Sequence, residues 1–207
     1  MPFQITPAIR GILIAMSVVL ALLLFGQSAI LEWLVLKPLQ AGFMPWQVVT
    51  YALVDPSGLG LFINGLILVM FGAQMEYSWG TRRFLTYLVN CVAGAGVVYL
   101  LATLLLPAVG PVGPAYGFTP AIMGLLLAFV IRDPNATIML IIPPIPMKAR
   151  TLFIVIVVLQ VVFGWAAGPV VVLSNLSGAV FGWLTLRYWQ GKPPFPPKRP
   201  RGPRLVK

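Results

Sequence analysis

The sequence contains no histidine, a single cysteine and only four acidic residues among 207. Without histidine, the chain lacks the side chain that most often accepts and donates protons near neutral pH. The lone Cys91 excludes an internal disulfide and a thiolate metal site, and we expect neither a metal nor a cofactor. Charged residues make up only 9% of the chain, whereas an ordinary soluble domain carries about 25%. This composition excludes an ordinary soluble domain.

The sequence is rich in apolar residues, which make up 59% of it. A helix of about 20 apolar residues crosses a bilayer. We therefore predict an all-α polytopic membrane protein, a bundle of six transmembrane helices that occupies residues 1–190. The predicted spans are 9–25, 59–77, 84–106, 119–131, 151–166 and 170–189. The first segment resembles a signal peptide, but no small-residue cleavage pattern follows it, so we expect it to be retained.

The basic residues are distributed unevenly along the chain, which has a net charge of +10. Six of the fourteen lie in the proline-rich tail 191–207, and with six spans Lys37 is the one basic residue on the other side. The positive-inside rule then predicts a multi-pass protein of the cell membrane with both termini cytoplasmic. We expect the tail to bind anionic lipids, as basic segments beside a membrane helix do, and we do not expect nucleic acid as a partner.

Small residues recur at helical spacing in two of the predicted spans. Residues three and four apart share one face of a helix, and a face without bulk lets another helix approach closely in a bilayer. We predict that these residues pack the two helices together. The stripes are Gly117, Ala121 and Gly124, and Ser174, Gly178 and Gly182.

Over residues 46–189 the chain resembles the rhomboid intramembrane proteases. Four blocks in order carry the resemblance, which implies a rhomboid-like six-helix bundle. They are Pro45 to Tyr51; Asn64, Gly72, Glu76, Gly80, Arg82, Arg83 and Phe84; Pro134-Asn135 with Pro144-Ile145-Pro146 and Lys148; and Gly178, Gly182 and Trp183.

The resemblance also implies where a catalytic site would lie. In that family a serine in a Gly-x-Ser-Gly motif is activated by a histidine of the last span, and polar groups of the second span help to hold the oxyanion. Carried over, the nucleophile position falls on Thr119 and the base position on Asn175. The second-span histidine position falls on Gly60, and the nearby oxyanion asparagine is kept as Asn64.

The residues at these positions do not form a competent catalytic set. The amide of Asn175 has no useful basicity, and losing a general base typically costs about 10²- to 10⁴-fold in rate. Thr119 before Pro120 is a favourable helix start, so we expect Thr119 to be the N-cap. We also expect a contact between Thr119 and Asn175, and a buried hydrogen-bonding role for Asn64. Asp55, in a turn before the second span, could approach this region, whereas Glu76 lies at the far end of that span.

Three functions follow as hypotheses. The first is a pseudoprotease that binds transmembrane segments of client proteins through the lateral opening that the family uses for substrates. The second is an intramembrane endopeptidase with Thr119 as nucleophile. The third is a small carrier or structural bundle, which is disfavoured because carriers usually place strongly polar groups in mid-span and this chain has few.

Overall fold

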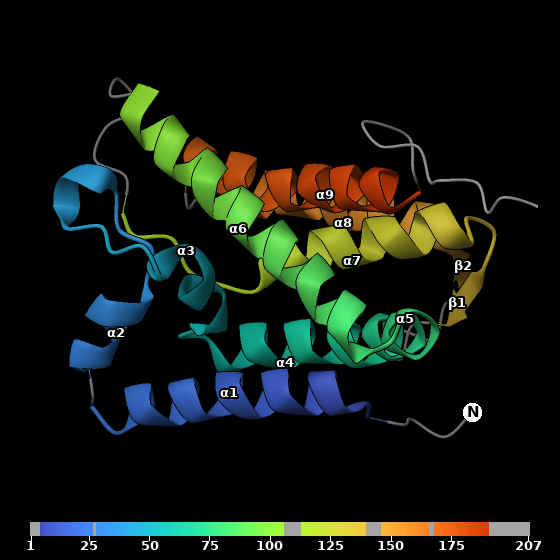
Figure 1. Cartoon of the computed structure of the whole chain (residues 1–207), viewed down its shortest axis with the longest axis horizontal. Coiled ribbons are helices and arrows are strands. Elements are labelled where there is room, and N and C mark those ends of the chain that lie inside the picture. The colour runs from blue at the N-terminus through green and yellow to red at the C-terminus, as the bar shows by residue number, and fades with distance from the viewer. Residues whose placement is uncertain (1–4, 27, 106–112, 140–145, 166–167, 191–207) are drawn as a thin grey trace, which may run out of the picture.

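The computed structural model describes residues 5–26, 28–105, 113–139, 146–165 and 168–190, and the basic tail lies outside the described residues. Within these ranges the chain is almost entirely helical (Figure 1). The long helices are α1 (Pro7–Leu24), α6 (Thr81–Leu105) and α9 (Pro169–Trp189), and α7 (Thr119–Arg132) and α8 (Ala149–Gly164) are shorter. A further long helix runs through α4 (Gly58–Ile67), the π-helical stretch η3 (Leu68–Gly72) and α5 (Ala73–Trp79).

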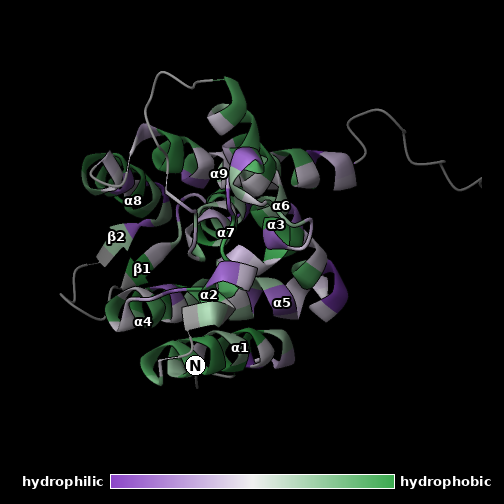
Figure 2. Ribbon diagram, turned by 90° about the vertical axis from the view of Figure 1, so that its left-hand side faces the viewer, coloured by the Kyte–Doolittle hydropathy of each residue, from purple (hydrophilic) through white to green (hydrophobic). Residues whose placement is uncertain are grey.

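These helices confirm the predicted fold class of an all-α polytopic membrane protein. They coincide with the six predicted apolar spans to within three residues at each end. Four of them are long and apolar enough to cross a membrane: Pro7–Leu24, Gly58–Trp79, Thr81–Leu105 and Pro169–Trp189. Helices α7 and α8 have only 14 and 16 residues, fewer than the roughly 20 that span a bilayer. Apolar residues predominate in the helices (Figure 2).

Helix α7 is the centre of the bundle. It lies between the α1–α4 layer and the α8–α9 layer, and α6 runs obliquely across the layers (Figure 1). Nearly every residue from Pro120 to Phe129 is buried, because this helix is apolar all round and has no solvent- or lipid-facing side. The most extensive helix contacts in the described part of the chain are those of α9 with α6 and with α7.

A short two-stranded hairpin follows α7. Strand β1 (Thr137–Met139) pairs antiparallel with β2 (Pro146–Lys148), with Ile138 opposite Met147. Strands of three residues leave no periodicity to read in the sequence, and Pro146 sits at a strand start, where its missing N–H is tolerated.

The polar and aromatic stretch after α1 forms a cap at one end of the bundle, built from α2 (Ser28–Leu34), η1 (Leu39–Ala41), α3 (Gln47–Thr50) and η2 (Tyr51–Leu53). The fully buried Gln47 accepts backbone hydrogen bonds from Lys37 and Met44 at 3.3 and 3.2 Å, and donates to the carbonyl of Glu32 at 3.2 Å. One side chain therefore satisfies backbone groups from three segments of the cap.

At the opposite end of the bundle a buried carboxylate joins three helices. Glu76, near the end of α5, accepts hydrogen bonds from the Thr6 hydroxyl, from the Ala8 backbone amide at 3.1 Å and from the Thr81 hydroxyl at 2.7 Å. The first N–H groups of a helix have no partner within it and carry partial positive charge, so a carboxylate is stabilised there. Glu76 thus anchors the start of α1 beside the start of α6.

Candidate functional site

Helices α7 and α9 meet backbone to backbone at three glycines. A Cβ added to Gly178 would lie 2.2 Å from the carbonyl oxygen of Pro120, and one added to Gly124 would lie 3.1 Å from the carbonyl oxygen of Gly178. A Cβ on Gly182 would lie 3.1 Å from the Cα of Gly124. These distances leave no room for a side chain, so the structure brings Gly124, Gly178 and Gly182 together as one close seam.

Helix α6 closes this seam from a third side. The phenol of Tyr87 donates to the carbonyl of Gly124 at 2.6 Å, and the hydroxyl of Ser174 donates to the carbonyl of Ala95 at 3.0 Å. Ala121 is fully buried. The small residues of α7 and α9 therefore also admit the polar and sulfur-bearing side chains of α6, including Cys91, whose Sγ lies 2.4 Å from a Cβ placed on Gly124.

Gly117 does not belong to this helical face, and the prediction that it shares one with Ala121 and Gly124 is wrong. Helix α7 begins two residues later, at Thr119, and Gly117 has φ +108°, in the left-handed region that favours glycine. Its amide donates to the carbonyl of Tyr51 at 3.1 Å. Gly117 is thus a turn residue that ties the start of α7 to η2.

Thr119 is the first residue of α7 rather than its N-cap. The N-cap position is taken by Phe118, whose carbonyl accepts from the amide of Ile122 at 3.2 Å, and no side chain caps the helix. Among the described residues, the hydroxyl of Thr119 makes no hydrogen bond, to Asn175 or to any other group. The predicted capping role is therefore wrong, and the contact expected between Thr119 and Asn175 includes no hydrogen bond among the described residues.

Asn175 lies half-buried in α9 next to the residue that does link the helices. Ser174 makes the hydrogen bond to α6, and Ser177 donates to the carbonyl of Ser174 at 2.6 Å. Consecutive helical residues point about 100° apart, so the side chain that reaches α6 is that of Ser174 and not that of its neighbour. The carried-over base position thus holds a side chain that contributes no proton acceptor to Thr119.

The second-span positions are organised around a carboxylate. Asn64 donates from Nδ2 to Oδ2 of Asp55 at 3.2 Å, and the backbone amide of Ser57 donates to Oδ1 at 3.1 Å. A Cβ on Gly60 would lie 2.8 Å from both carboxylate oxygens, so only glycine leaves room for Asp55 there. Asn64 is a hydrogen-bonding partner of a buried acid and does not present its amide to Thr119.

The sequence analysis expected that Asp55 could approach this region but did not predict its bonds to Ser57 and Asn64. The side chain is 7% exposed, and burial raises the pKa of its carboxyl group above 3.8, an effect that the hydrogen bonds from Ser57 and Asn64 partly offset. The signal that could have found it is the glycine at position 60, one helical turn before Asn64 in a stretch that starts with an acidic turn. A glycine and an amide on one face leave space and a donor for a carboxylate.

The chain matches a known protein family over most of its length. The model of the family described as eukaryotic integral membrane protein (DUF1751) matches residues 8–202, which include every helix and strand described above except the first residue of α1. That family is in the rhomboid-like superfamily. No curated protein matches the chain.

Proposed function

The chain belongs to the eukaryotic integral membrane protein family DUF1751, and from this premise we propose that it is a rhomboid-like protein without proteolytic activity. In this proposal it binds transmembrane segments of other membrane proteins. The observation that carries the proposal is the pairing of a close glycine seam with a Thr119 hydroxyl that has no hydrogen-bonded base among the described residues.

The chemistry around the hydroxyl of Thr119 supports the proposal. A hydroxyl becomes a useful nucleophile only when an adjacent group accepts its proton. The carboxylate of Asp55, in the turn before α4, accepts from the Ser57 amide and from Asn64 instead. A proteolytic site would need a nucleophile, a base and an oxyanion donor. Here the base position holds an asparagine, Asn175, and the amide of Asn64 at the oxyanion position is hydrogen-bonded to Asp55.

The way α8 packs on the bundle also supports the proposal. Its buried residues are Ala149 and Leu152, both in its first turn; Phe153 and Ile156 are partly buried, and most apolar side chains beyond them are exposed. Helices α4 and α8 both contact α7 from the two layers that enclose it, and in Figure 2 both are displaced to the left of α7. A helix held mainly at one end separates easily from its neighbour, so we place client binding between α4 and α8.

The membrane topology is part of the proposal. Arg82, Arg132 and Arg150 lie at the end of the bundle where α6 begins, α7 ends and α8 begins, and Lys37 lies at the other end with α2 and α3 (Figure 1). Six crossings, with the short α7 and α8 included, put both termini on the arginine-rich side. By the positive-inside rule that side is cytoplasmic.

Site-specific photo-crosslinking tests client binding. A photoreactive residue replaces Phe62 of α4 or Val158 of α8, which are 61% and 53% exposed, and Ile14 of α1, also 53% exposed, is the matched control. We expect transmembrane proteins with polar or helix-breaking spans to crosslink from positions 62 and 158 and not from position 14. Equal labelling at all three positions would show contact with neighbouring lipid-embedded proteins at random and would contradict the proposal.

A further inference from the structure

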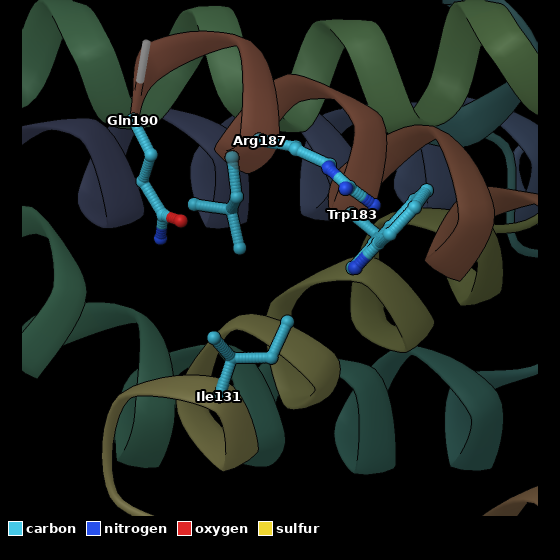
Figure 3. Close-up of a pocket in the computed structure, with 5 residues that line it drawn as sticks. Ile131, Trp183, Arg187 and Gln190 are labelled. Carbon is cyan, nitrogen blue, oxygen red and sulfur yellow. The ribbon is translucent and has the colours of Figure 1, made fainter. Parts of the chain in front are cut away.

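A cavity of about 200 Å³ opens between the ends of α7 and α9 (Figure 3). Ile131 of α7 lines it together with Trp183, Leu186, Arg187 and Gln190 of α9. Pockets for whole drug-sized molecules usually measure about 300–1,000 Å³, so this one fits a smaller group. We propose that it binds the phosphate-bearing headgroup of an anionic membrane lipid.

The polar wall of the cavity suits a phosphate. The guanidinium of Arg187 stacks 4.8 Å from the centre of the Trp183 ring, which holds a long side chain in one orientation. In the described part of the chain Arg187 makes no ion pair, since the ion pair found there joins Lys37 to Glu32. A guanidinium presents paired N–H donors that match phosphate oxygens, and the amide of Gln190 adds a further donor.

The apolar wall suits the part of a lipid next to its phosphate. Leu186 is buried and Ile131 is exposed, and in Figure 3 the side chain of Ile131 lies across the cavity from Arg187 and Gln190. A soluble anion would gain nothing from these two aliphatic side chains. The glycerol and first methylenes of a lipid would remove them from water.

The cavity lies at the height of the lipid headgroups. Trp79, at the end of the second apolar helix, packs on Tyr87 and on Trp189 with ring centres 5.2 and 5.9 Å apart. Such aromatic residues gather where a membrane meets water. Gln190, one residue beyond Trp189, therefore sits at that boundary.

The charge at this end of the bundle favours an anion. Among the described residues there, Glu76 is buried and fully engaged, and Asp133 is the one exposed carboxylate. The tail that follows Gln190 has six basic and no acidic residues, so it does not complement Arg187. The basic residues at this end are Arg10, Arg82, Arg83, Arg132, Lys148, Arg150 and Arg187.

Native mass spectrometry of the full-length protein in neutral detergent tests the proposal, with phosphatidylserine as the probe and phosphatidylcholine, which has a phosphate but no net charge, as the comparison. We expect Arg187→Gln to weaken the first phosphatidylserine bound by about tenfold or more, the value of one charge-assisted hydrogen bond. Arg150→Gln removes the same charge at the same end outside the cavity and is expected to change binding far less. Thermal melting of both variants checks that they fold.

Two results would overturn the lipid site. The first is equal weakening by Arg187→Gln and Arg150→Gln, which would indicate general charge attraction, or equal binding of phosphatidylcholine by the wild type, which would show no preference for an anionic headgroup. The second is displacement of the lipid by glycerol 3-phosphate at concentrations comparable with those of the lipid itself, which would indicate a site for a soluble phosphate.

Discussion

At the scale of single residues, the structure depends on places where a side chain is absent. Gly178 and Gly124 let two helix backbones touch, and Gly60 leaves space for a carboxylate. In a bilayer there is no hydrophobic force between helices, so van der Waals contact and interhelical hydrogen bonds hold them together. The loss of close contact is therefore more damaging here than the loss of a surface group.

Gly178→Ala is expected to destabilise the protein by about 1–3 kcal/mol or more, because overpacking a tight contact costs that much and the nearest atom is backbone. The added methyl would meet the Pro120 carbonyl at 2.2 Å. Gly11→Ala in α1 is the control, since nothing lies within 4 Å of that position. Thermal unfolding in detergent measures both, and equal stability of the two variants would contradict the close seam.

Asp55→Asn is expected to raise the melting temperature at neutral pH. Because burial raises the pKa of Asp55 in the folded state, its charged form costs stability above that pKa, and the cost disappears as pH falls below the unfolded value of 3.8. The gain from Asp55→Asn should therefore shrink toward zero in acid. Melting curves as a function of pH check this, and a gain that is independent of pH would refute it.

At the scale of elements, the positions of the helices were predictable because apolar length and turn chemistry are local properties. Turn residues that are recognisable in the sequence mark several helix ends. Asp55-Pro56-Ser57-Gly58 leads into α4, Gly80 separates α5 from α6, Asp133-Pro134 follows α7, and Gly168-Pro169 begins α9. The π-helical η3 and the β1–β2 hairpin were not predictable, since each is decided by packing with distant residues.

The candidate site was predictable only in part for the same reason. The small residues of α7 and α9 pointed to a seam because their spacing is helical. The partner of Asn64 and the free hydroxyl of Thr119 depend on how loops and helix ends are placed in three dimensions. Gly117 was assigned to the helix because a sequence pattern does not show that its φ is positive.

Glu76 illustrates an element-scale role that the sequence did not indicate. The carboxylate of Glu76 accepts hydrogen bonds from Thr6, Ala8 and Thr81 at the starts of α1 and α6, and Glu76→Gln removes its charge. The substitution is expected to lower the free energy of unfolding by about 1.5–3 kcal/mol, the value of a hydrogen bond to a charged group.

The matched control is Glu32→Gln. The carboxylate of Glu32 is exposed and lies 3.6 Å from Lys37, so its loss should cost at most about 1 kcal/mol. Chemical or thermal unfolding of the two variants decides the matter. If Glu32→Gln proves as costly as Glu76→Gln, the anchoring of α1 through Glu76 is wrong.

At the scale of the whole molecule, the bundle combines a tightly packed interior with a loosely attached flank. Helix α7 is buried on nearly every side and is joined to α9 and α6 by glycines, while α8 is buried only in its first turn. A firm core beside a separable helix is the arrangement that a protein needs if it is to accept another transmembrane segment. We propose that such binding does not lead to cleavage, because no base among the described residues is hydrogen-bonded to Thr119.

Cleavage in proteoliposomes tests this account most directly. Purified wild-type protein and Thr119→Ala are reconstituted with a transmembrane substrate that contains helix-breaking residues, and products are followed by mass spectrometry. The account predicts no scission by the wild type above the level of Thr119→Ala or of empty liposomes. Peptide-bond cleavage that disappears in Thr119→Ala would contradict it and would identify the protein as a threonine-dependent intramembrane endopeptidase.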